Sequence, residues 1–360
     1  MRAWRTNDPG FDTEVVIGRN GPLAPEYAAL GELRTAGLER RSPEQLTARG
    51  LDALGLASLG RRVRAAATRL RVADRPTDLV VVNGATAAGV ELLRTTQQAP
   101  TALIAHELST GWMANLSTAD RRLLLARTTA YLAVSEAVRS YLVEHQGVDP
   151  ATVQVTPPPV DVAFVPPDRS SRNGDRCVVV GGGVADWRKA PELFVTVAHH
   201  CREQAPEIDW AFRWFGGGTG TDPAAWPLQV EVERLGLASN VTFTGPLEDV
   251  GPELAGGDVF LLTAKEDAAP LVAAEAAGAG LPIVTFNSGG VEELVRDGRC
   301  GEIVAYPDVS GLAAAVVALA RDPERRRRLG ESGAAFVADE RRSDVVADRV
   351  AAWIRGTLTS

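Results

Sequence analysis

The chain has 360 residues, which suits two domains of ordinary size better than one hydrophobic core. Hydrophobic residues make up 45% of it, and the net charge is −8, which argues against nucleic acid as a partner and against a general affinity for anionic membranes. No stretch has the length and apolar character of a transmembrane segment or a signal peptide. We therefore expect a cytoplasmic protein; a local basic patch would still permit peripheral membrane association.

Four short apolar runs in the N-terminal half are typical of parallel strands, with helical patterns between them: 78–85, 101–107, 130–136 and 152–157. The segment 156–175 is rich in Pro, Ser and Gly, as linkers are. These patterns predict an N-terminal domain over 1–160 and a linker over 161–175.

The C-terminal half alternates six further apolar runs with helical patterns: 177–183, 210–218, 240–245, 258–264, 282–286 and 302–306. Strands alternating with helices predict a doubly wound α/β domain, here over 176–340. Ligands of such domains bind at the carboxyl ends of the strands. An amphipathic helix over 341–360, with Trp353 on its apolar side, can pack back on the N-terminal domain.

The segment KEDAAPLVAAEAAGAGLP (265–282) places acidic residues around a helix start. Pro270 suits the first helical position, and the backbone N–H groups at 268–272 would form an anion site. A phosphate bound there would repel a neighbouring carboxylate, unless that carboxylate accepts hydrogen bonds from sugar hydroxyls. Asp267 and Glu275 therefore indicate a sugar–diphosphate–nucleoside; for Asp267, a plain helix cap is the alternative.

The loop GGGVADWRKA (181–190) lacks the third glycine of a dinucleotide fingerprint. Arg188 and Lys189 lie between its strand and the next helix, where they can neutralise a diphosphate leaving group. A solvated residue at the helix start is the other interpretation of Arg188. The chain has only two lysines, Lys189 and Lys265, and each falls in one of these two segments.

Both segments resemble motifs of the retaining GT-B glycosyltransferases of family four (group 1): the acidic E-x7-E region and the G-x-x-D-W-R-K-G loop. The resemblance implies an α/β GT-B fold, with two Rossmann-like domains facing a cleft. It assigns the donor sugar to Asp267, the ribose to Glu275 and the phosphates to Lys189. The sequence departs from the family at Val184, at Lys265 and at Ala268–Ala269, and we expect Arg188 to compensate for Val184.

Weaker segments extend the resemblance to other residues. It implies contacts with the base at Gly245, Pro246 and Leu247, and close backbone approach to the donor at Gly289 and Gly290. It places His106 on the acceptor side, with Asn83 and Glu107 as further candidates, although a lone His after a strand is often structural. The expected site residues are therefore His106, Asp267 and Lys189 as catalytic residues and, for the donor, Arg188, Lys189, Gly245, Pro246, Leu247, Asp267, Ala268, Ala269, Pro270, Leu271 and Glu275.

The function implied is transfer of a sugar from a nucleotide-sugar to a glycan, lipid or small-molecule acceptor with retention of configuration, as in polysaccharide biosynthesis. The leaving phosphate would help to deprotonate the acceptor, and we expect no metal or other cofactor. One alternative is a GT-B-like nucleotide-sugar-binding protein without transferase activity. A nicotinamide-dependent oxidoreductase is disfavoured because the glycine fingerprint is incomplete.

The N-terminus departs from the family pattern. GT-B enzymes usually begin with a strand and a glycine-rich loop, whereas MRAW resembles the end of the first helix and TEVVIG (13–18) the second strand. We therefore expect the N-terminal domain to lack its first strand. Either the native protein is longer, or this form has lost part of its active site.

Overall fold

The computed structural model describes residues 14–17, 32–35, 43–56, 77–96, 99–160, 176–220 and 225–359, with isolated positions at 28, 59, 60, 63, 222 and 223. The chain divides into two compact units. The N-terminal unit comprises Met1–Val134, Val138–Thr156 and Ala347–Ser360, and the C-terminal unit comprises Ser135–Ala137 and Pro157–Val346. The linker expected at 161–175 and the first 13 residues lie outside the described residues.

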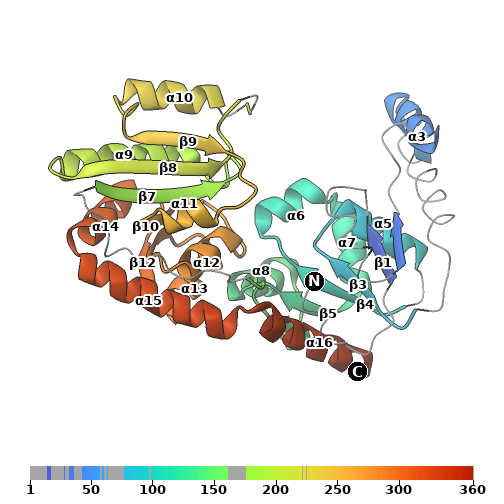
Figure 1. The fold of residues 1–360 in the computed structure, drawn as a ribbon. Coiled ribbons are helices and arrows are strands. Elements are labelled where there is room, and N and C mark those ends of the chain that lie inside the picture. The colour runs from blue at the N-terminus through green and yellow to red at the C-terminus, as the bar shows by residue number, and fades with distance from the viewer. Residues whose placement is uncertain are drawn as a thin grey trace. The chain divides into compact units, whose positions relative to one another are not determined.

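The N-terminal unit contains a four-stranded parallel sheet in the order β3-β4-β5-β6 (Figure 1). A separate parallel pair is formed by β1, which lies in the predicted segment 13–18, and β2. The strands are β1 (Glu14–Ile17), β2 (Glu32–Thr35), β3 (Val80–Asn83), β4 (Thr101–Ala105), β5 (Thr128–Ala133) and β6 (Val153–Val155). The helices are α3 (Pro43–Ala53), α5 (Ala87–Thr95), α6 (Ser109–Asn115), α7 (Thr118–Arg127) and α8 (Glu136–Gln146).

The last helix of the chain, α16 (Ser343–Thr359), packs against this N-terminal sheet (Figure 1, dark red). Trp353 is 4% exposed and lies in one apolar cluster with Ala102 of β4 and Leu132 of β5. Burying an indole removes a large apolar surface from water, so the end of the chain contributes directly to the core of its N-terminal unit.

The C-terminal unit contains a six-stranded parallel sheet, as the six apolar runs predicted. The strands are β7 (Arg176–Gly183), β8 (Asp209–Gly216), β9 (Val241–Gly245), β10 (Val259–Leu262), β11 (Ile283–Phe286) and β12 (Gly301–Val304). Their order is β12-β11-β10-β7-β8-β9. The chain therefore moves outward from β7 to β9, returns to β10 beside β7, and continues in the other direction. This reversal places the loops after β7 and β10 next to each other.

Helices cover both faces of the C-terminal sheet, because successive side chains of a buried strand point to opposite faces. In β7, Val179 packs in one apolar cluster, whereas Val178 and Val180 pack in the other. The first cluster includes residues of α9 (Pro191–Gln204), α10 (Ala225–Arg234) and α14 (Val309–Arg321). The second includes residues of α11 (Gly251–Ala255), α12 (Leu271–Gly278), α13 (Val291–Gly298) and α15 (Pro323–Glu340).

The sequence patterns did not predict helix α15. Its apolar periodicity is weak because glycines occupy the face that packs inward. A Cβ at Gly330 would overlap the carbonyl oxygen of Gly280, and one at Gly333 would lie 2.8 Å from the Cβ of Cys300. The two glycines thus permit a close approach of α15 to the end of α12, which a pattern of large apolar residues would not show.

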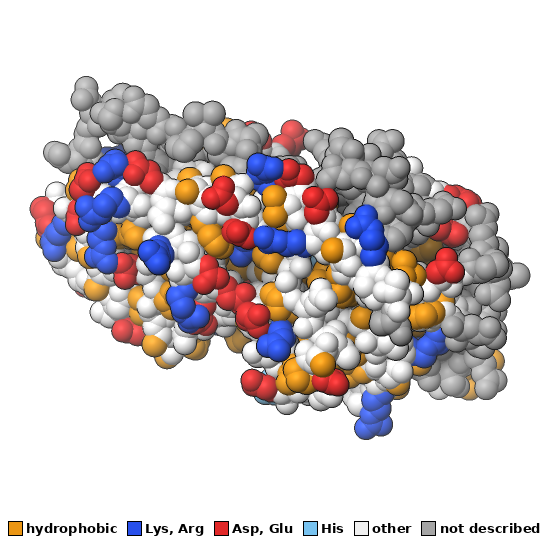
Figure 2. Space-filling model, turned by 90° about the horizontal axis from the view of Figure 1, so that it is seen from below, with side chains coloured by type: hydrophobic (Ala, Val, Ile, Leu, Met, Phe, Trp, Pro, Cys, Tyr) orange, Lys and Arg blue, Asp and Glu red, His pale blue; other side chains and the backbone are white. Residues whose placement is uncertain are grey.

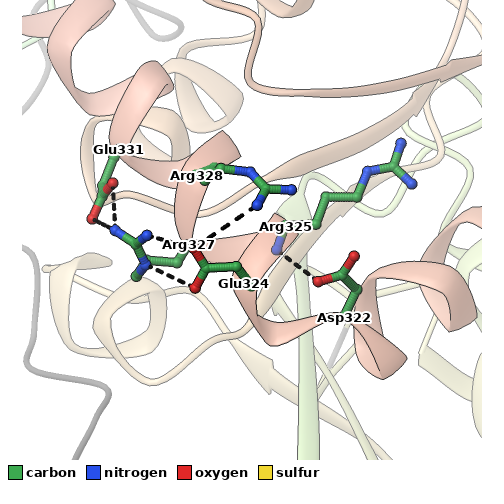
Figure 3. Close-up of polar contacts among 6 residues, drawn as sticks. All are labelled: Asp322, Glu324, Arg325, Arg327, Arg328 and Glu331. Atoms are coloured by element: carbon green, nitrogen blue, oxygen red, sulfur yellow. Dashed lines mark hydrogen bonds and ion pairs between the residues drawn. The ribbon is translucent and has the colours of Figure 1, made fainter.

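The charged run at the start of α15 is paired partly on the helix itself (Figure 3) and partly with Glu302 of β12 and with carbonyl groups of α14. The carboxylate of Asp322 accepts the N–H of Arg325 and caps the helix. The guanidinium of Arg327 lies 2.7 Å from a carboxylate oxygen of Glu324 and 2.7 Å from one of Glu331. On the face drawn in Figure 2, acidic and basic side chains are interspersed. Exposed pairs of this kind contribute little to stability.

Replacing Trp353 with Ala tests the contribution of α16 to the N-terminal unit. We expect a loss of about 3–5 kcal/mol, the usual cost of emptying a buried indole site. Denaturant unfolding followed by circular dichroism measures the loss. Trp226→Ala is the matched control: Trp226 is 74% exposed, so its removal should change stability by no more than about 0.5 kcal/mol. Equal effects of the two substitutions would contradict the packing described.

Candidate functional site

The candidate site is formed by the two loops that follow β7 and β10, where the strand order of the C-terminal unit reverses. The N–H of Lys265 donates to the carbonyl of Arg188 at 2.8 Å. The hydroxyl of Thr263 lies 3.2 Å from the carbonyl oxygen of Lys189 and 3.0 Å from that of Ala190. Backbone and side-chain hydrogen bonds thus join two segments that are more than 70 residues apart in sequence.

Local geometry places Lys189 at the end of its loop. The carboxylate of Asp186 accepts the N–H of Lys189 at 2.8 Å, and Ala190 adopts a left-handed conformation with φ of 51°. Gly183 has φ of 142°, and a Cβ there would lie 3.1 Å from the aliphatic stem of Lys189. The glycine therefore leaves room for the stem to pass over the end of β7.

The central feature is a buried ion pair. The Nζ atom of Lys189 lies 2.5 Å from Oδ2 of Asp267, and both residues are less than 10% exposed. A guanidinium nitrogen of Arg188 lies 3.7 Å from the same oxygen. Two cations thus share one carboxylate, so the site carries positive charge in excess of what Asp267 neutralises.

The backbone of Asp267 is fixed on both sides. Its N–H donates to the carbonyl of Ser288 at 2.8 Å, and its carbonyl accepts the N–H of Gly290 at 3.0 Å. Gly289 has φ of 123°, and a Cβ at Gly290 would overlap the carbonyl oxygen of Ala268. The glycine pair therefore brings the loop after β11 against the segment that carries Asp267.

The second lysine has a different set of contacts. The Nζ atom of Lys265 lies 2.8 Å from a carboxylate oxygen of Glu192 in α9, and 5.3 Å from the centroid of the Trp187 ring. Both contacts stabilise the arrangement of the loop after β7. Trp187 and Val184 remain 62% and 65% exposed. Of the two lysines, only Lys189 is paired with Asp267.

Helix α12 begins at Leu271, so Pro270 is its N-cap residue rather than its first helical residue. Ala273 and Ala274 donate to the carbonyl of Pro270. The N–H groups of Leu271 and Val272 lie before these residues, in the first turn, where the helix offers no acceptor of its own. No side chain forms a capping hydrogen bond to this helix start. The carboxylate of Asp267 contacts Lys189 instead, so the structure does not support its interpretation as a helix cap.

Glu275 lies in the second turn of α12 and is partly buried among alanines. Loss of solvation raises the pKa of its carboxyl group above the ordinary value. Ala268 and Ala269 are half-buried between Asp267 and Pro270, and Leu271 is 49% exposed.

The residues expected at the base follow β9. Gly245 has φ of +79°, and a Cβ there would lie 2.6 Å from the hydroxyl of Thr219. Pro246 and Leu247 are exposed. They lie at the carboxyl end of the edge strand, two strands along the sheet from β7.

In the N-terminal unit, Asn83 and His106 lie at the carboxyl ends of β3 and β4. Their side chains meet, with Nε2 of His106 2.6 Å from Oδ1 of Asn83. One carboxylate oxygen of Glu107 accepts the N–H of Ala85 at 2.9 Å and that of His106 at 3.2 Å. Loss of solvation lowers the pKa of His106, and the carboxylate of Glu107 acts in the opposite direction.

Three residues of the candidate site were not predicted: Asp186, Glu192 and Thr263. An aspartate three residues before Lys189 is a recognisable local signal, since Asp side chains often accept nearby N–H groups. No local signal marks Glu192 or Thr263, because their partners lie more than 70 residues away.

Among the residues that the structure describes, no group of three or more His, Cys, Asp or Glu could hold a metal ion. Within the same residues, no helix combines the length and hydropathy that crossing a membrane requires.

Removing one member of the buried ion pair should cost more than removing both. We expect Asp267→Ala to lose about 3–5 kcal/mol of stability, because it leaves the ammonium of Lys189 buried without its carboxylate. The double substitution Lys189→Met and Asp267→Ala should recover most of this loss, and a double-mutant cycle with the two single variants measures the coupling. In the exposed pair Arg176–Asp209, Asp209→Ala should cost less than about 1 kcal/mol. Additive effects at 189 and 267 would refute the coupling.

The raised pKa of Glu275 makes the stability of the C-terminal unit depend on pH. The folded protein holds this proton to a higher pH than the unfolded chain. Its free energy of unfolding therefore falls as the pH rises from the pKa of Glu275 in the unfolded chain to the pKa in the folded protein. Glu275→Gln has no proton to lose. We expect the variant to match the wild type at about pH 4 and to be more stable at about pH 8 in denaturant titrations. A stability difference that does not change with pH would show that the burial of Glu275 carries no such cost.

Comparison with known proteins assigns each half of the chain to glycosyltransferase sequences. Residues 8–164 match the model described as Glycosyltransferase Family 4, and residues 174–322 match that described as Glycosyl transferases group 1. The D-inositol 3-phosphate glycosyltransferase of Paenarthrobacter aurescens is 33% identical over 204 residues, which are 54% of this chain and 49% of that protein.

A second relative is the GDP-mannose-dependent alpha-(1-6)-phosphatidylinositol monomannoside mannosyltransferase of Mycolicibacterium smegmatis. It is 32% identical over 206 residues, which are 52% of each chain. The chain thus spans about half the length of the curated relatives it matches.

A solved structure shows the same fold along nearly the whole chain. The structure of Anabaena HepE in complex with UDP has a TM-score of 0.74 and 17% sequence identity, over 99% of this chain and 95% of that one. The two parallel sheets, the strand order of the C-terminal unit and these matches agree: the chain has the GT-B fold, and its two halves match the Glycosyltransferase Family 4 and Glycosyl transferases group 1 models in turn.

Proposed function

We propose that the protein is a glycosyltransferase that transfers a sugar from a nucleotide-sugar donor to a hydroxyl acceptor with retention of anomeric configuration. The observation that carries this proposal is the arrangement at the reversal of the strand order. There, Lys189, Arg188 and Asp267 lie together, and Asp267 shortly precedes the start of α12. Cations beside a helix N-terminus suit a diphosphate, and a carboxylate among them suits the hydroxyls of a sugar.

The roles follow from the chemistry of each group. Lys189 and Arg188 neutralise the diphosphate as charge develops on the leaving group, and the N-terminus of α12 adds its dipole. Asp267 accepts hydrogen bonds from the donor sugar, and Glu275 from the ribose. Ala268 to Leu271 approach the phosphates, and Gly245 to Leu247 contact the base. Gly289 and Gly290 allow the backbone to approach the donor.

Donor binding requires an exchange of partners at Lys189. Its ammonium group contacts Asp267, and it turns to the phosphate when the donor enters. The carboxylate is then released to the sugar hydroxyls. This exchange avoids leaving either buried charge without a partner, which would be costly.

Under this proposal the leaving phosphate helps to deprotonate the acceptor, so the reaction needs no protein nucleophile. Helix dipole and basic side chains offset the diphosphate charge, and we therefore propose that no metal ion takes part. His106 acts on the acceptor side, where its imidazole can exchange hydrogen bonds with the reacting sugars. Asn83 and Glu107 support it.

Relatives indicate which ligands to test first. The curated relatives are named for inositol 3-phosphate and for a phosphatidylinositol mannoside, and HepE was solved with UDP. We propose a polyol, free or as the head group of a lipid, as the acceptor. The cysteines Cys177, Cys201 and Cys300 are buried and free, which fits a reducing compartment such as the cytoplasm.

A thermal-shift screen with UDP-, GDP-, ADP- and dTDP-sugars tests donor binding. A donor at about 100 times its Kd should stabilise the protein by about 2.7 kcal/mol. Donor hydrolysis and transfer to the acceptor are then measured with the donor that binds. Binding without hydrolysis or transfer would favour a nucleotide-sugar-binding protein, a reading to which Ala268–Ala269 also lend support because the family motif has Pro–Phe there.

Lys189→Ala should lower the rate of transfer by about two or more orders of magnitude, because it removes a charge that stabilises the leaving group. Steady-state kinetics with the identified donor measures the change. Arg176→Ala is the matched control: it removes a positive charge from the same strand, β7, at the end remote from the loop. A rate near that of the wild type in Lys189→Ala would refute the assignment.

A further inference from the structure

The side chains of Asn83 and His106 meet at the carboxyl ends of two neighbouring strands. Asn83 ends β3, and His106 directly follows β4, the neighbouring strand. In the strand register Asn83 lies opposite Ile104, two residues before His106. The carboxyl ends of the two strands thus bring both side chains together, with Nε2 of His106 2.6 Å from Oδ1 of Asn83.

The backbone on both sides of this contact is held in place. The N–H of Gly84 donates to the carbonyl of Ile104 at 2.8 Å, and Gly84 has φ of +89°. One oxygen of Glu107 accepts the N–H groups of Ala85 and His106 and so links the two turns. A Cβ at Gly111 would lie 2.7 Å from that of Glu107, so its stem packs closely on α6. Backbone hydrogen bonds therefore fix the positions from which the two side chains meet.

An amide oxygen can only accept a hydrogen bond, so the ring nitrogen that faces it must donate. A neutral imidazole has one N–H and one lone pair, and a proton on Nε2 leaves the lone pair on Nδ1. We propose that Asn83 is a positioning residue that holds His106 as the Nε2–H tautomer and makes Nδ1 its basic nitrogen. Loss of solvation lowers the pKa of His106, which favours the neutral form to which this choice applies.

The tautomer determines how His106 can take part in catalysis, a consequence that rests on the proposed function. A sugar hydroxyl that donates a hydrogen bond or a proton to His106 must approach Nδ1. Asn83 acts through the ring and not on the substrate. Its loss should therefore lower kcat more than it changes the KM for the donor.

Nuclear magnetic resonance of the ring nitrogens tests the tautomer directly. The chain has four histidines, so the 15N-labelled protein gives a simple spectrum, and His106→Gln identifies the signals of His106 by their loss. At a pH where the ring is neutral, we expect the Nε2 shift of a protonated nitrogen and the Nδ1 shift of one with a lone pair. The proton on Nδ1 in the wild-type protein would overturn the inference.

Three variants separate the contact from general effects on the fold. Asn83→Ala should give an averaged mixture of tautomers, and Asn83→Asp should keep the proton on Nε2 and raise the pKa of His106 by about one unit or more. Asn115→Ala, an exposed asparagine at the end of α6, should leave the His106 signals unchanged. If neither substitution at Asn83 changes the His106 signals, the positioning role is wrong.

An activity assay completes the test. We expect Asn83→Ala to lower kcat on the order of tenfold. This decrease is smaller than the loss expected on removing a catalytic acid or base itself. An unchanged kcat together with a changed tautomer would overturn the positioning role. The resonance experiment needs no substrate, so it establishes the tautomer even if the protein turns over no donor. An absence of turnover would then contradict the proposed function and not the tautomer.

Discussion

The ion pair between Lys189 and Asp267 depends on the strand order of the C-terminal sheet. Two residues that are 78 positions apart meet because β7 and β10 are neighbours and their carboxyl ends lie at one edge. Both residues are less than 10% exposed. Because an unpaired buried charge is costly, the ammonium and carboxylate groups must be held within contact distance of each other. The loops around the pair are accordingly tied by hydrogen bonds that Thr263 and Lys265 donate, and the carboxylate of Asp186 accepts the N–H of Lys189.

Glycines allow these loops to approach one another. Gly183 accommodates the stem of Lys189, and Gly290 lies against the carbonyl of Ala268. At the back of α12, Gly330 and Gly333 do the same for α15. A side chain at any of these positions would push apart elements that now pack closely. The arrangement thus combines close backbone packing with a small number of polar contacts.

The carboxyl ends of the parallel strands present different groups in the two units. In the C-terminal unit the ends of β7 and β10 present cations around one carboxylate. In the N-terminal unit the ends of β3 and β4 present an imidazole that contacts an amide, and the backbone N–H of His106 donates to Glu107. The first arrangement suits a charged phosphate, and the second suits hydroxyl groups and protons.

The sequence by itself determined β1, the strands β3 to β6, the six strands and most helices of the C-terminal unit, and the segments that carry Lys189 and Asp267, because these follow from periodicity and local motifs. It missed β2 and also α15, whose packing face includes Gly330 and Gly333, and it expected Pro270 at the first helical position of α12, where the structure has it as the N-cap. Only the tertiary structure decided that Lys189 rather than Lys265 pairs with Asp267, that Glu192 and Trp187 contact Lys265, and that Asn83 meets His106. These partners lie on different strands and loops, and their pairing depends on strand order and close packing, which one-dimensional patterns do not encode.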